Sequence, residues 1–337
     1  MHTLLIAELA QAHEGSLGIL HSYIDALAAT GVDAVKFQTH IAEAESSLAE
    51  PFRIKFSYED DTRYDYWKRM SFSLEQWRGI KDHCEEVGVE FISSPFSQTA
   101  VELLEDLEVK RYKIASGEVS NFLMLEKIAK TGKPIILSSC MSSYAELDAA
   151  IDFLRPFGNA LSLLQCTTSY PTPPQRIGFN VLGEMMARYP DLTIGLSEHT
   201  SEIFTGLAAV AMGAQILEFH AVFDKRMFGP DAQSSLSIDQ ITELVRGVRF
   251  LESALANPVD KHDNSAYQGL KAIFEKSLAV RYDLAAGHEL TFDDLETKKP
   301  SGQGLPASSF RELLGRPLKR AKKKYEFLTA EEFCPFE

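Results

Sequence analysis

Short apolar runs rich in β-branched residues alternate along the chain with longer stretches whose apolar residues recur every three or four positions. The short runs predict buried β-strands and the longer stretches predict amphipathic helices. The predicted strands are Leu4–Leu9, Ala34–Gln38, Glu90–Ser93, Lys110–Ile114, Pro134–Leu137, Leu161–Gln165, Thr193–Leu196 and Ile216–His220. The predicted helices are Leu17–Thr30, Leu74–Val87, Ala100–Leu107, Leu123–Thr131, Ser143–Leu154, Gly178–Tyr189, Ile203–Met212 and Ser237–Ala254.

These elements form eight strand–helix units in about 255 residues, which is the number and size expected of an α/β fold of the (β/α)₈ TIM-barrel type. An open, doubly wound sheet is the alternative. No G-x-G-x-x-G motif opens the first helix, which argues against the dinucleotide-binding version of that sheet. Gly31 and Gly132 each follow a predicted helix, where a left-handed cap residue is favoured. We therefore predict a closed barrel.

The pattern changes after the last predicted helix. A polar stretch begins at Asn257, and short strand and turn patterns follow from Lys276 onward. We predict a catalytic barrel over residues 1–256, a linker over 257–275 and a small module over 276–337. A module of about 60 residues buries only a small core, so we expect it to pack on another surface.

Composition indicates an ordinary globular protein, with 45% hydrophobic and 24% charged residues. No apolar run approaches the ~20 residues that span a bilayer. The N-terminal segment lacks a basic region and reaches Glu8 early, which is not typical of a signal peptide. The four cysteines, Cys84, Cys140, Cys166 and Cys334, show no paired spacing. We expect them to be reduced thiols in a cytoplasmic protein.

The formal net charge of −14 argues against a nucleic acid or an anionic membrane as partner, because both need a basic face. The negative charge lies almost wholly before Lys276, since residues 276–337 hold 11 basic and 10 acidic side chains. An anionic substrate would therefore need a few local cations to hold it against this background.

Polar residues recur where the predicted strands end, which is where (β/α)₈ barrels carry their chemistry. Lys36 and Gln38 are two positions apart on one strand and so face the same way. Lys113 ends another strand, and two desolvated ammonium groups at one mouth are unfavourable unless an anion lies between them. A phosphate and a carboxylate would provide that anion. The neutral donors available to it are Ser94, Ser116 and Ser197.

His199 follows the seventh predicted strand closely, and His220 ends the eighth. Neutral imidazoles at neighbouring strand ends can share one divalent ion and leave positions open for water and substrate. This suits a catalytic Mn²⁺ or Mg²⁺, and two separate hydrogen-bonded histidines are the alternative. Carboxylates near the same mouth can bind sugar hydroxyls or act as a base, and the pattern leaves these roles open. They are Glu14, Glu118, Glu218 and Asp231.

Segments along nearly the whole chain resemble the sialic acid synthase family, which includes N-acetylneuraminate, legionaminic and pseudaminic acid synthases. These segments are IAELAQAHEGSL, VDAVKFQTH, EFISSPFS, YKIASGE, GKPIILSSCMS, CTTSYPTP, IGLSEHT, GAQILEFH and GPDAQSSLS. The C-terminal segments KSLAVRYDLAAGHELTFDDLETKKPSGQG and LLGRPLKR are similar to the antifreeze-like (SAF) domain of these enzymes.

The resemblance implies a transferase that condenses phosphoenolpyruvate with N-acetylmannosamine or a related N-acylated amino sugar and releases phosphate by C–O cleavage. It implies that phosphoenolpyruvate is surrounded by Lys36, Ser94, Lys113, Ser116, Ser197 and His199. It implies that the sugar is contacted by Glu14, Gln38, Glu118, Tyr170 and Asp231. Glu118 or Glu14 is then the candidate base for the water that adds during the reaction.

The resemblance also implies a divalent metal on His199 and His220, most simply Mn²⁺, with Mg²⁺ or Co²⁺ as alternatives. It implies a domain-swapped homodimer in which the SAF module reaches over the barrel of the partner subunit. Lys299 of that module then faces the substrate.

The chain departs from the family pattern at Ala12, Gln165, Thr168, Glu198 and Lys299. The resemblance implies that four of the five lie beside the sugar or just behind the residues that contact it, so the departures leave open which sugar is used. One alternative is a 2,4-diacetamido-trideoxy hexose, as in legionaminic or pseudaminic acid synthesis. A non-catalytic carbohydrate-binding protein and a phosphoenolpyruvate-using barrel enzyme that makes a phosphorylated keto sugar acid are the others.

Overall fold

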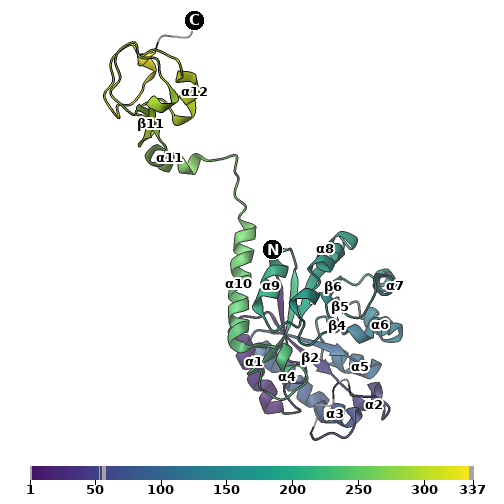
Figure 1. The fold of residues 1–337 in the computed structure, drawn as a ribbon. Coiled ribbons are helices and arrows are strands. Elements are labelled where there is room, and N and C mark those ends of the chain that lie inside the picture. Colours follow the sequence, from purple (N-terminus) through teal and green to yellow (C-terminus); the bar gives the residue numbers. More distant parts are fainter. Residues whose placement is uncertain (1, 53, 55–57, 334–337) are drawn as a thin grey trace. The chain divides into compact units, whose positions relative to one another are not determined.

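The computed structural model describes residues 2–52, 54 and 58–333, and the chain divides into two units, Met1–Asn257 and Pro258–Glu337 (Figure 1). In the first unit eight parallel strands pair in sequence order, and β8 pairs with β1 to close the sheet. The strands are β1 (Leu4–Glu8), β2 (Ala34–Thr39), β3 (Glu90–Pro95), β4 (Tyr112–Ile114), β5 (Ile135–Ser138), β6 (Leu161–Cys166), β7 (Thr193–Glu198) and β8 (Ile216–Val222). The predicted (β/α)₈ barrel is confirmed, and the open sheet was the wrong alternative.

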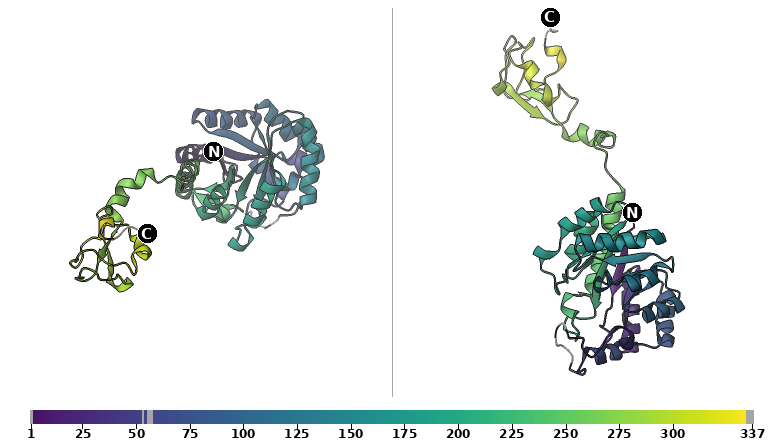
Figure 2. Two further views of the ribbon diagram at one scale, coloured as in Figure 1. Left: turned by 90° about the horizontal axis from the view of Figure 1, so that it is seen from above. Right: turned by 90° about the vertical axis from the view of Figure 1, so that its right-hand side faces the viewer.

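Helices surround the strands, as the left view of Figure 2 shows. Those that follow the strands are α1 (Leu17–Thr30), α4 (Leu74–Glu86), α5 (Gln98–Asp106), α6 (Phe122–Ala129), α7 (Tyr144–Leu154), α8 (Phe179–Arg188), α9 (Ile203–Ala211) and α10 (Ile238–Ala256). Gly31 and Gly132 adopt the predicted left-handed conformation. Two short helices that the sequence pattern did not predict, α2 (Ala42–Glu45) and α3 (Arg63–Met70), lie between β2 and α4. A two-residue strand, β9 (Leu236–Ser237), pairs with β8.

Side chains inside the barrel form an apolar layer with a polar layer above it. The apolar layer consists of Ile6, Ala34, Ile92, Ile136, Leu164 and Ile216. Gly195 completes it on β7, where an added Cβ would lie 2.3 Å from the Ile216 carbonyl oxygen. Because strand side chains alternate with a period of two, the residue two positions further along each strand also points inward. Those residues are Glu8, Lys36, Ser94, Ser138, Cys166, Ser197 and Glu218.

The opposite faces of the strands pack against the helices in the main hydrophobic core. Phe37 lies between Lys36 and Gln38 on β2 and stacks on Phe91, with ring centroids 5.0 Å apart. Both rings contact Trp77 of α4 edge-on. This confirms the expected alternation on β2, because the polar residues face the barrel interior while Phe37 faces the helices.

The second unit is small and has its own core. It contains the antiparallel strands β10 (Ser277–Val280) and β11 (Leu295–Lys298) and the helices α11 (Gln268–Phe274) and α12 (Phe310–Leu313). Its buried core consists of Leu278, Val280, Leu284, Leu290, Leu313, Leu318, Leu328 and Phe333. Within the described parts of the chain, no helix combines the length and apolar character needed to cross a membrane.

Candidate active site

A cavity of about 460 Å³ opens at the carboxyl ends of the barrel strands. It is lined by 11 of the predicted site residues. These are Lys36, Gln38, Ser94, Lys113, Ser116, Glu118, Tyr170, Ser197, His199, His220 and Asp231. Closure of the barrel brings these side chains together from strands that are far apart in the sequence.

Two lysines and two glutamates form a buried cluster at the base of the cavity. Lys36 Nζ lies 2.6 Å from Glu8 Oε1 and 3.6 Å from Glu218 Oε1. Lys113 Nζ lies 3.4 Å from the same Glu218 oxygen and donates a hydrogen bond to Ser138 Oγ (2.5 Å). The sequence pattern predicted a substrate anion between the two lysines. Glu218 occupies part of that place, a role that the sequence pattern alone did not assign to it.

The charges in this cluster change one another's protonation. Burial opposes ionisation of Glu8, but the charges of Lys36, His220 and Lys113 outweigh it and lower the pKa of this carboxyl. Burial likewise disfavours the charged form of Lys36, yet Glu218 and Glu8 raise its pKa. For Lys113 burial prevails, and the pKa of this ammonium is lowered despite the attraction of Glu218. The cluster therefore holds Lys113 as the more readily deprotonated of the two lysines.

His199 and His220 lie side by side above this cluster, with ring centroids 5.2 Å apart. The Nδ1 of His199 lies 3.2 Å from the Thr167 carbonyl oxygen, which can only accept, so Nδ1 carries the proton. Burial and the neighbouring His220 lower the pKa of His199 to about 3. The ring is therefore neutral, and its Nε2 has a lone pair available for a ligand. Tyr170 packs on the same ring, with centroids 4.4 Å apart.

A sequence model of the NeuB family matches residues 23–260, which is more than half of the chain. The chain belongs to the NeuB family. The predicted family is thus confirmed, and with it the expectation of an enzyme of the synthase type.

Relatives of this NeuB-family chain include synthases of more than one sugar acid. It is 34% identical to human "N-acetylneuraminate-9-phosphate synthase", with 93% of this chain and 87% of that protein covered. It is 32% identical to "N,N'-diacetyllegionaminic acid synthase" of Campylobacter jejuni, with 97% and 98% covered. A crystal structure of N-acetylneuraminic acid synthetase from Leptospira borgpetersenii is similar with a TM-score of 0.71 and 26% identity, covering 80% of this chain and 90% of that one.

The outer part of the cavity is formed by His40 and the segment that carries α2 and α3, which sequence reasoning missed. His40 is stacked between Trp67 and Phe96, with ring centroids 3.8 and 4.3 Å away. Its Nε2 lies 3.0 Å from Gln38 Oε1, and its Nδ1 lies 2.6 Å from Glu45 Oε1. The hydrogen bond from Gln38 Nε2 to Glu8 Oε1 (2.7 Å) connects this outer part to the lysine cluster. The one available signal was His40, a histidine that directly follows β2, two positions after Gln38.

Two predicted site residues do not line the cavity. The carboxylate of Glu14 is engaged by Arg69, at 3.0 Å between Oε2 and Nη1, and burial raises its pKa. Lys299 belongs to the second unit, where its ammonium lies over the Phe274 ring at 4.8 Å. The predicted contacts of both residues with substrate stay predictions.

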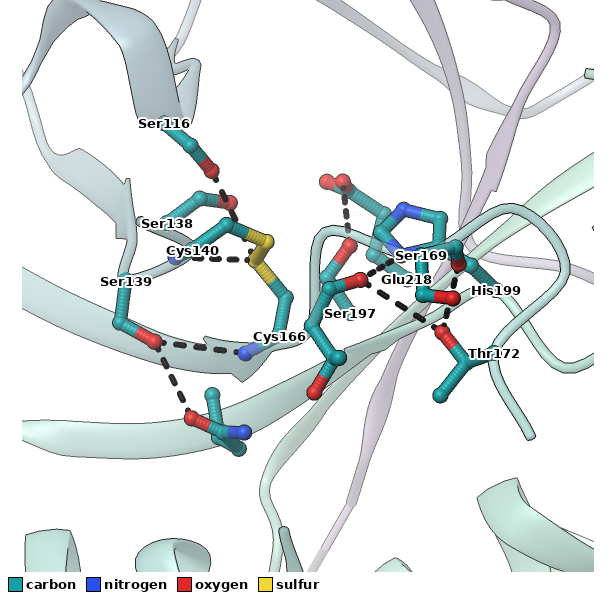
Figure 3. The surroundings of a disulfide bond; sticks show 12 residues. Ser116, Ser138, Ser139, Cys140, Cys166, Ser169, Thr172, Ser197, His199 and Glu218 are labelled. Carbon is teal, nitrogen blue, oxygen red and sulfur yellow. Dashed lines mark hydrogen bonds between the residues drawn. A yellow bond between two sulfur atoms is a disulfide. The ribbon is translucent and has the colours of Figure 1, made fainter. Parts of the chain in front are cut away.

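Cys140 and Cys166 form a disulfide, so the expectation of reduced thiols was wrong for this pair (Figure 3). They are 26 residues apart in sequence, but the neighbouring strands β5 and β6 bring their Cα atoms to 5.0 Å. Both line the cavity, and Ser116 Oγ lies 3.6 Å from Cys166 Sγ. Cys84 is a buried free thiol, and Cys334 lies outside the described residues.

The residues that depart from the family pattern lie at different distances from the cavity. Thr168 lines the cavity. Gln165 lies behind the cavity wall, accepting from Ser139 Oγ and donating to the Ile177 carbonyl oxygen. Glu198 is also buried behind the wall, where its Oε2 accepts from the backbone and hydroxyl of Thr200. Burial raises the pKa of Glu198 to about 7.

Proposed function

We propose that this NeuB-family enzyme condenses phosphoenolpyruvate with an N-acylated amino sugar of the N-acetylmannosamine type to give a nonulosonic acid. C3 of phosphoenolpyruvate forms a bond to the aldehyde carbon of the open-chain sugar, water adds at C2, and the C2–O bond to phosphate breaks. The observation that carries the proposal is the gathering of Lys36, Lys113, His199 and His220 around one cavity at the barrel mouth. The use of a 2,4-diacetamido-trideoxy hexose in the same reaction is the second candidate, favoured by the similarity to legionaminic acid synthase.

The base of the cavity suits phosphoenolpyruvate. Lys36 and Lys113 provide the positive charge that a phosphate and a carboxylate need, and serine hydroxyls provide neutral donors. Ser94 Oγ is buried and has no hydrogen-bond partner within the described part of the chain, so its hydroxyl is available to a phosphate oxygen. Ser116 and Ser197 line the same region.

Glu118 is the better placed of the two candidate bases. It lines the cavity, whereas Glu14 does not. Burial raises the pKa of Glu118, which makes its carboxylate a stronger acceptor for the proton that water loses. Its Oε2 accepts a hydrogen bond from Asn121 Nδ2 (2.7 Å), which orients the group. Gln38, Tyr170 and Asp231 remain the proposed sugar contacts.

We further propose that a divalent metal, most simply Mn²⁺ with Mg²⁺ or Co²⁺ as alternatives, is held by His199 and His220. Two imidazoles with adjacent rings fit such an ion, and the hydrogen bond from His199 Nδ1 to Thr167 leaves the Nε2 of that ring free to ligate it. No group of three or more His, Cys, Asp or Glu suited to a metal occurs among the described residues, so solvent and substrate would complete the coordination. Bound there, the metal would act as a Lewis acid on the aldehyde oxygen.

The second unit is proposed to be the antifreeze-like module and to cover the barrel of a partner subunit in a domain-swapped homodimer. It has its own small core, as such a module requires. Lys299 would then contribute to the neighbouring site. The cytoplasmic location stays a prediction.

The reaction is tested with phosphoenolpyruvate carrying ¹⁸O in its bridging C–O–P oxygen. We expect sugar-dependent phosphate release in the presence of Mn²⁺, with the label recovered in the phosphate. Label retained in the sugar acid would contradict C–O cleavage. Absence of phosphate release with N-acetylmannosamine and with diacetamido sugars would overturn the synthase proposal.

A further inference from the structure

The outer part of the cavity contains a carboxylate that is only partly used by the protein. We call the residues His40, Glu45, Glu50, Arg63, Trp67 and Phe96 the outer pocket. The side chain of Glu45 is 7% exposed, and its Oε1 pairs with His40. Its Oε2 is buried and has no hydrogen-bond partner among the residues that the structure describes. An unsatisfied buried carboxylate oxygen is costly, which points to a ligand that completes it.

Hydrogen bonding around His40 fixes where Glu45 lies. Gln38 donates through Nε2 to Glu8, so its Oε1 is an acceptor, and His40 Nε2 must be the donor to it. Nδ1 of the same ring then meets Glu45, and the two stacked aromatic rings prevent His40 from turning away. Glu45 is therefore a positioned group and not a mobile surface side chain.

Among the described residues, the outer pocket holds two carboxylates, Glu45 and Glu50, against one basic side chain. Arg63 is the one lysine or arginine that lines it within the described ranges, and its Nε lies 2.9 Å from Glu50 Oε1. Trp67 Nε1 donates to the other oxygen of Glu50 at 3.1 Å. Glu118 lies close enough to Glu45 that, after burial, this negative neighbour contributes to raising the pKa of Glu118. Like charges in a partly desolvated pocket repel an added anion.

We propose that Glu45 is a specificity-determining residue that accepts a hydrogen bond from a hydroxyl or amide N–H of the amino sugar, and that the outer pocket selects an uncharged acceptor over a sugar phosphate. The inference rests on the proposed function, since it concerns the sugar of that same reaction. Lys36 and Lys113 lie at the base of the cavity and are engaged by Glu8 and Glu218, so they do not neutralise a second phosphate at the outer end. Phe96 is only partly buried and lines the cavity, so its ring suits the apolar face of a sugar or an acyl methyl group.

The test compares N-acetylmannosamine with its 6-phosphate as acceptors. We expect the unmodified enzyme to favour the uncharged sugar by at least about a hundredfold in kcat/KM, because the carboxylates of the outer pocket repel the added phosphate. A hundredfold ratio corresponds to about 2.8 kcal/mol, at about 1.4 kcal/mol for each tenfold step. Glu45→Ala should raise KM for N-acetylmannosamine about tenfold or more, leave KM for phosphoenolpyruvate unchanged and reduce the preference over the phosphate about tenfold. Glu45→Gln retains a hydrogen-bond partner for His40 and removes only the charge. We expect a smaller rise in KM for N-acetylmannosamine than in Glu45→Ala, and a similar loss of preference for the uncharged sugar.

Glu43→Gln is the matched control, because Glu43 lies on the same helix with its side chain 62% exposed. It should change neither KM nor the preference, and thermal melts should show that all variants are folded. Preferential use of the 6-phosphate by the unmodified enzyme would overturn the inference, as would Glu45 variants that leave both quantities unchanged. Turnover of neither sugar, with diacetamido sugars also inactive, would instead count against the proposed function. In that case saturation-transfer NMR measures the binding of each sugar directly. Equal binding by the unmodified protein and by Glu45→Ala would overturn the proposed role of Glu45.

Discussion

Opposing effects act on the protonation of the Lys113 amine. Burial and the nearby charge of Lys36 disfavour its protonated form, while Glu218 favours it. Its position depends on Ser138 and Glu218, which lie on β5 and β8, so the group is fixed by strands other than its own. The sequence pattern predicted the lysine at this strand end, whereas its carboxylate partner became apparent only from the register of the closed barrel.

Removal of this ammonium should affect both activity and stability. We expect Lys113→Ala to lower kcat/KM for phosphoenolpyruvate by at least about a hundredfold, because a charge-assisted contact to the substrate is lost. It should also lower the free energy of unfolding by about 3 kcal/mol, because the buried carboxylate of Glu218 loses one of the two ammonium groups that balance its charge. Steady-state kinetics and urea unfolding measure the two effects. Lys110→Ala, at an exposed position, is the control, and a Lys113→Ala enzyme with unchanged kinetics would contradict the proposed role.

Glu198 should make stability depend on pH. Burial raises its pKa from 4.5 to about 7 in the folded protein, so the folded state binds this proton more tightly than the unfolded state. The resulting stability is present below pH 4.5 and is lost as the pH rises towards 7, by roughly 3 kcal/mol from the size of the shift. Glu198→Gln should therefore stabilise the protein more at pH 8 than at pH 5, as measured by urea unfolding at both values. An equal effect at the two pH values would contradict this assignment.

The elements of the barrel were predictable where they bury a continuous apolar surface. All eight strands were found from their short apolar runs, and Ser73, Ser143 and Ser237 cap helices that the pattern located. The helix α3 was missed because its sequence, RYDYWKRM, is largely polar, and its buried residues Tyr66, Trp67 and Met70 depend on contacts with distant segments. The outer pocket was missed for the same reason, since the stacking of His40 on Trp67 joins residues whose proximity no local pattern indicates.

The disulfide is likewise a property of neighbouring elements. Cys140 and Cys166 meet because β5 and β6 are adjacent, so spacing within the sequence gave no sign of the pair. We expect two more thiols to react with a maleimide in denaturant after reduction than before it, and peptide mapping without reductant should recover residues 140 and 166 in one linked species. The buried free thiol of Cys84, whose pKa burial raises to about 12, serves as an internal reference that reacts only in denaturant. Equal thiol counts before and after reduction would contradict the linkage.

At the scale of the whole molecule, the predicted site residues are divided between the two units of the chain. The barrel supplies 11 predicted site residues to one cavity, whereas Lys299 lies in the unit that follows Asn257. A unit with its own core can be positioned by another subunit without disturbing the barrel. The proposed domain-swapped homodimer therefore makes a prediction about which subunit contributes Lys299 to each site.

That prediction is tested by mixing two inactive or impaired variants. Lys113→Ala removes the barrel ammonium, and Lys299→Ala removes the ammonium of the second unit. If the second unit serves its partner, the mixed dimer contains one site with both lysines intact, and activity should return to about a quarter of the unmodified level, since half of the dimers are mixed and each has one intact site. If each second unit serves its own barrel, no site in the mixed dimer has both lysines, and the mixture should show no more than the average of the two variants. Subunits exchanged in mild urea and then examined by light scattering provide the control for dimer formation, and a purely monomeric protein would rule out the swap.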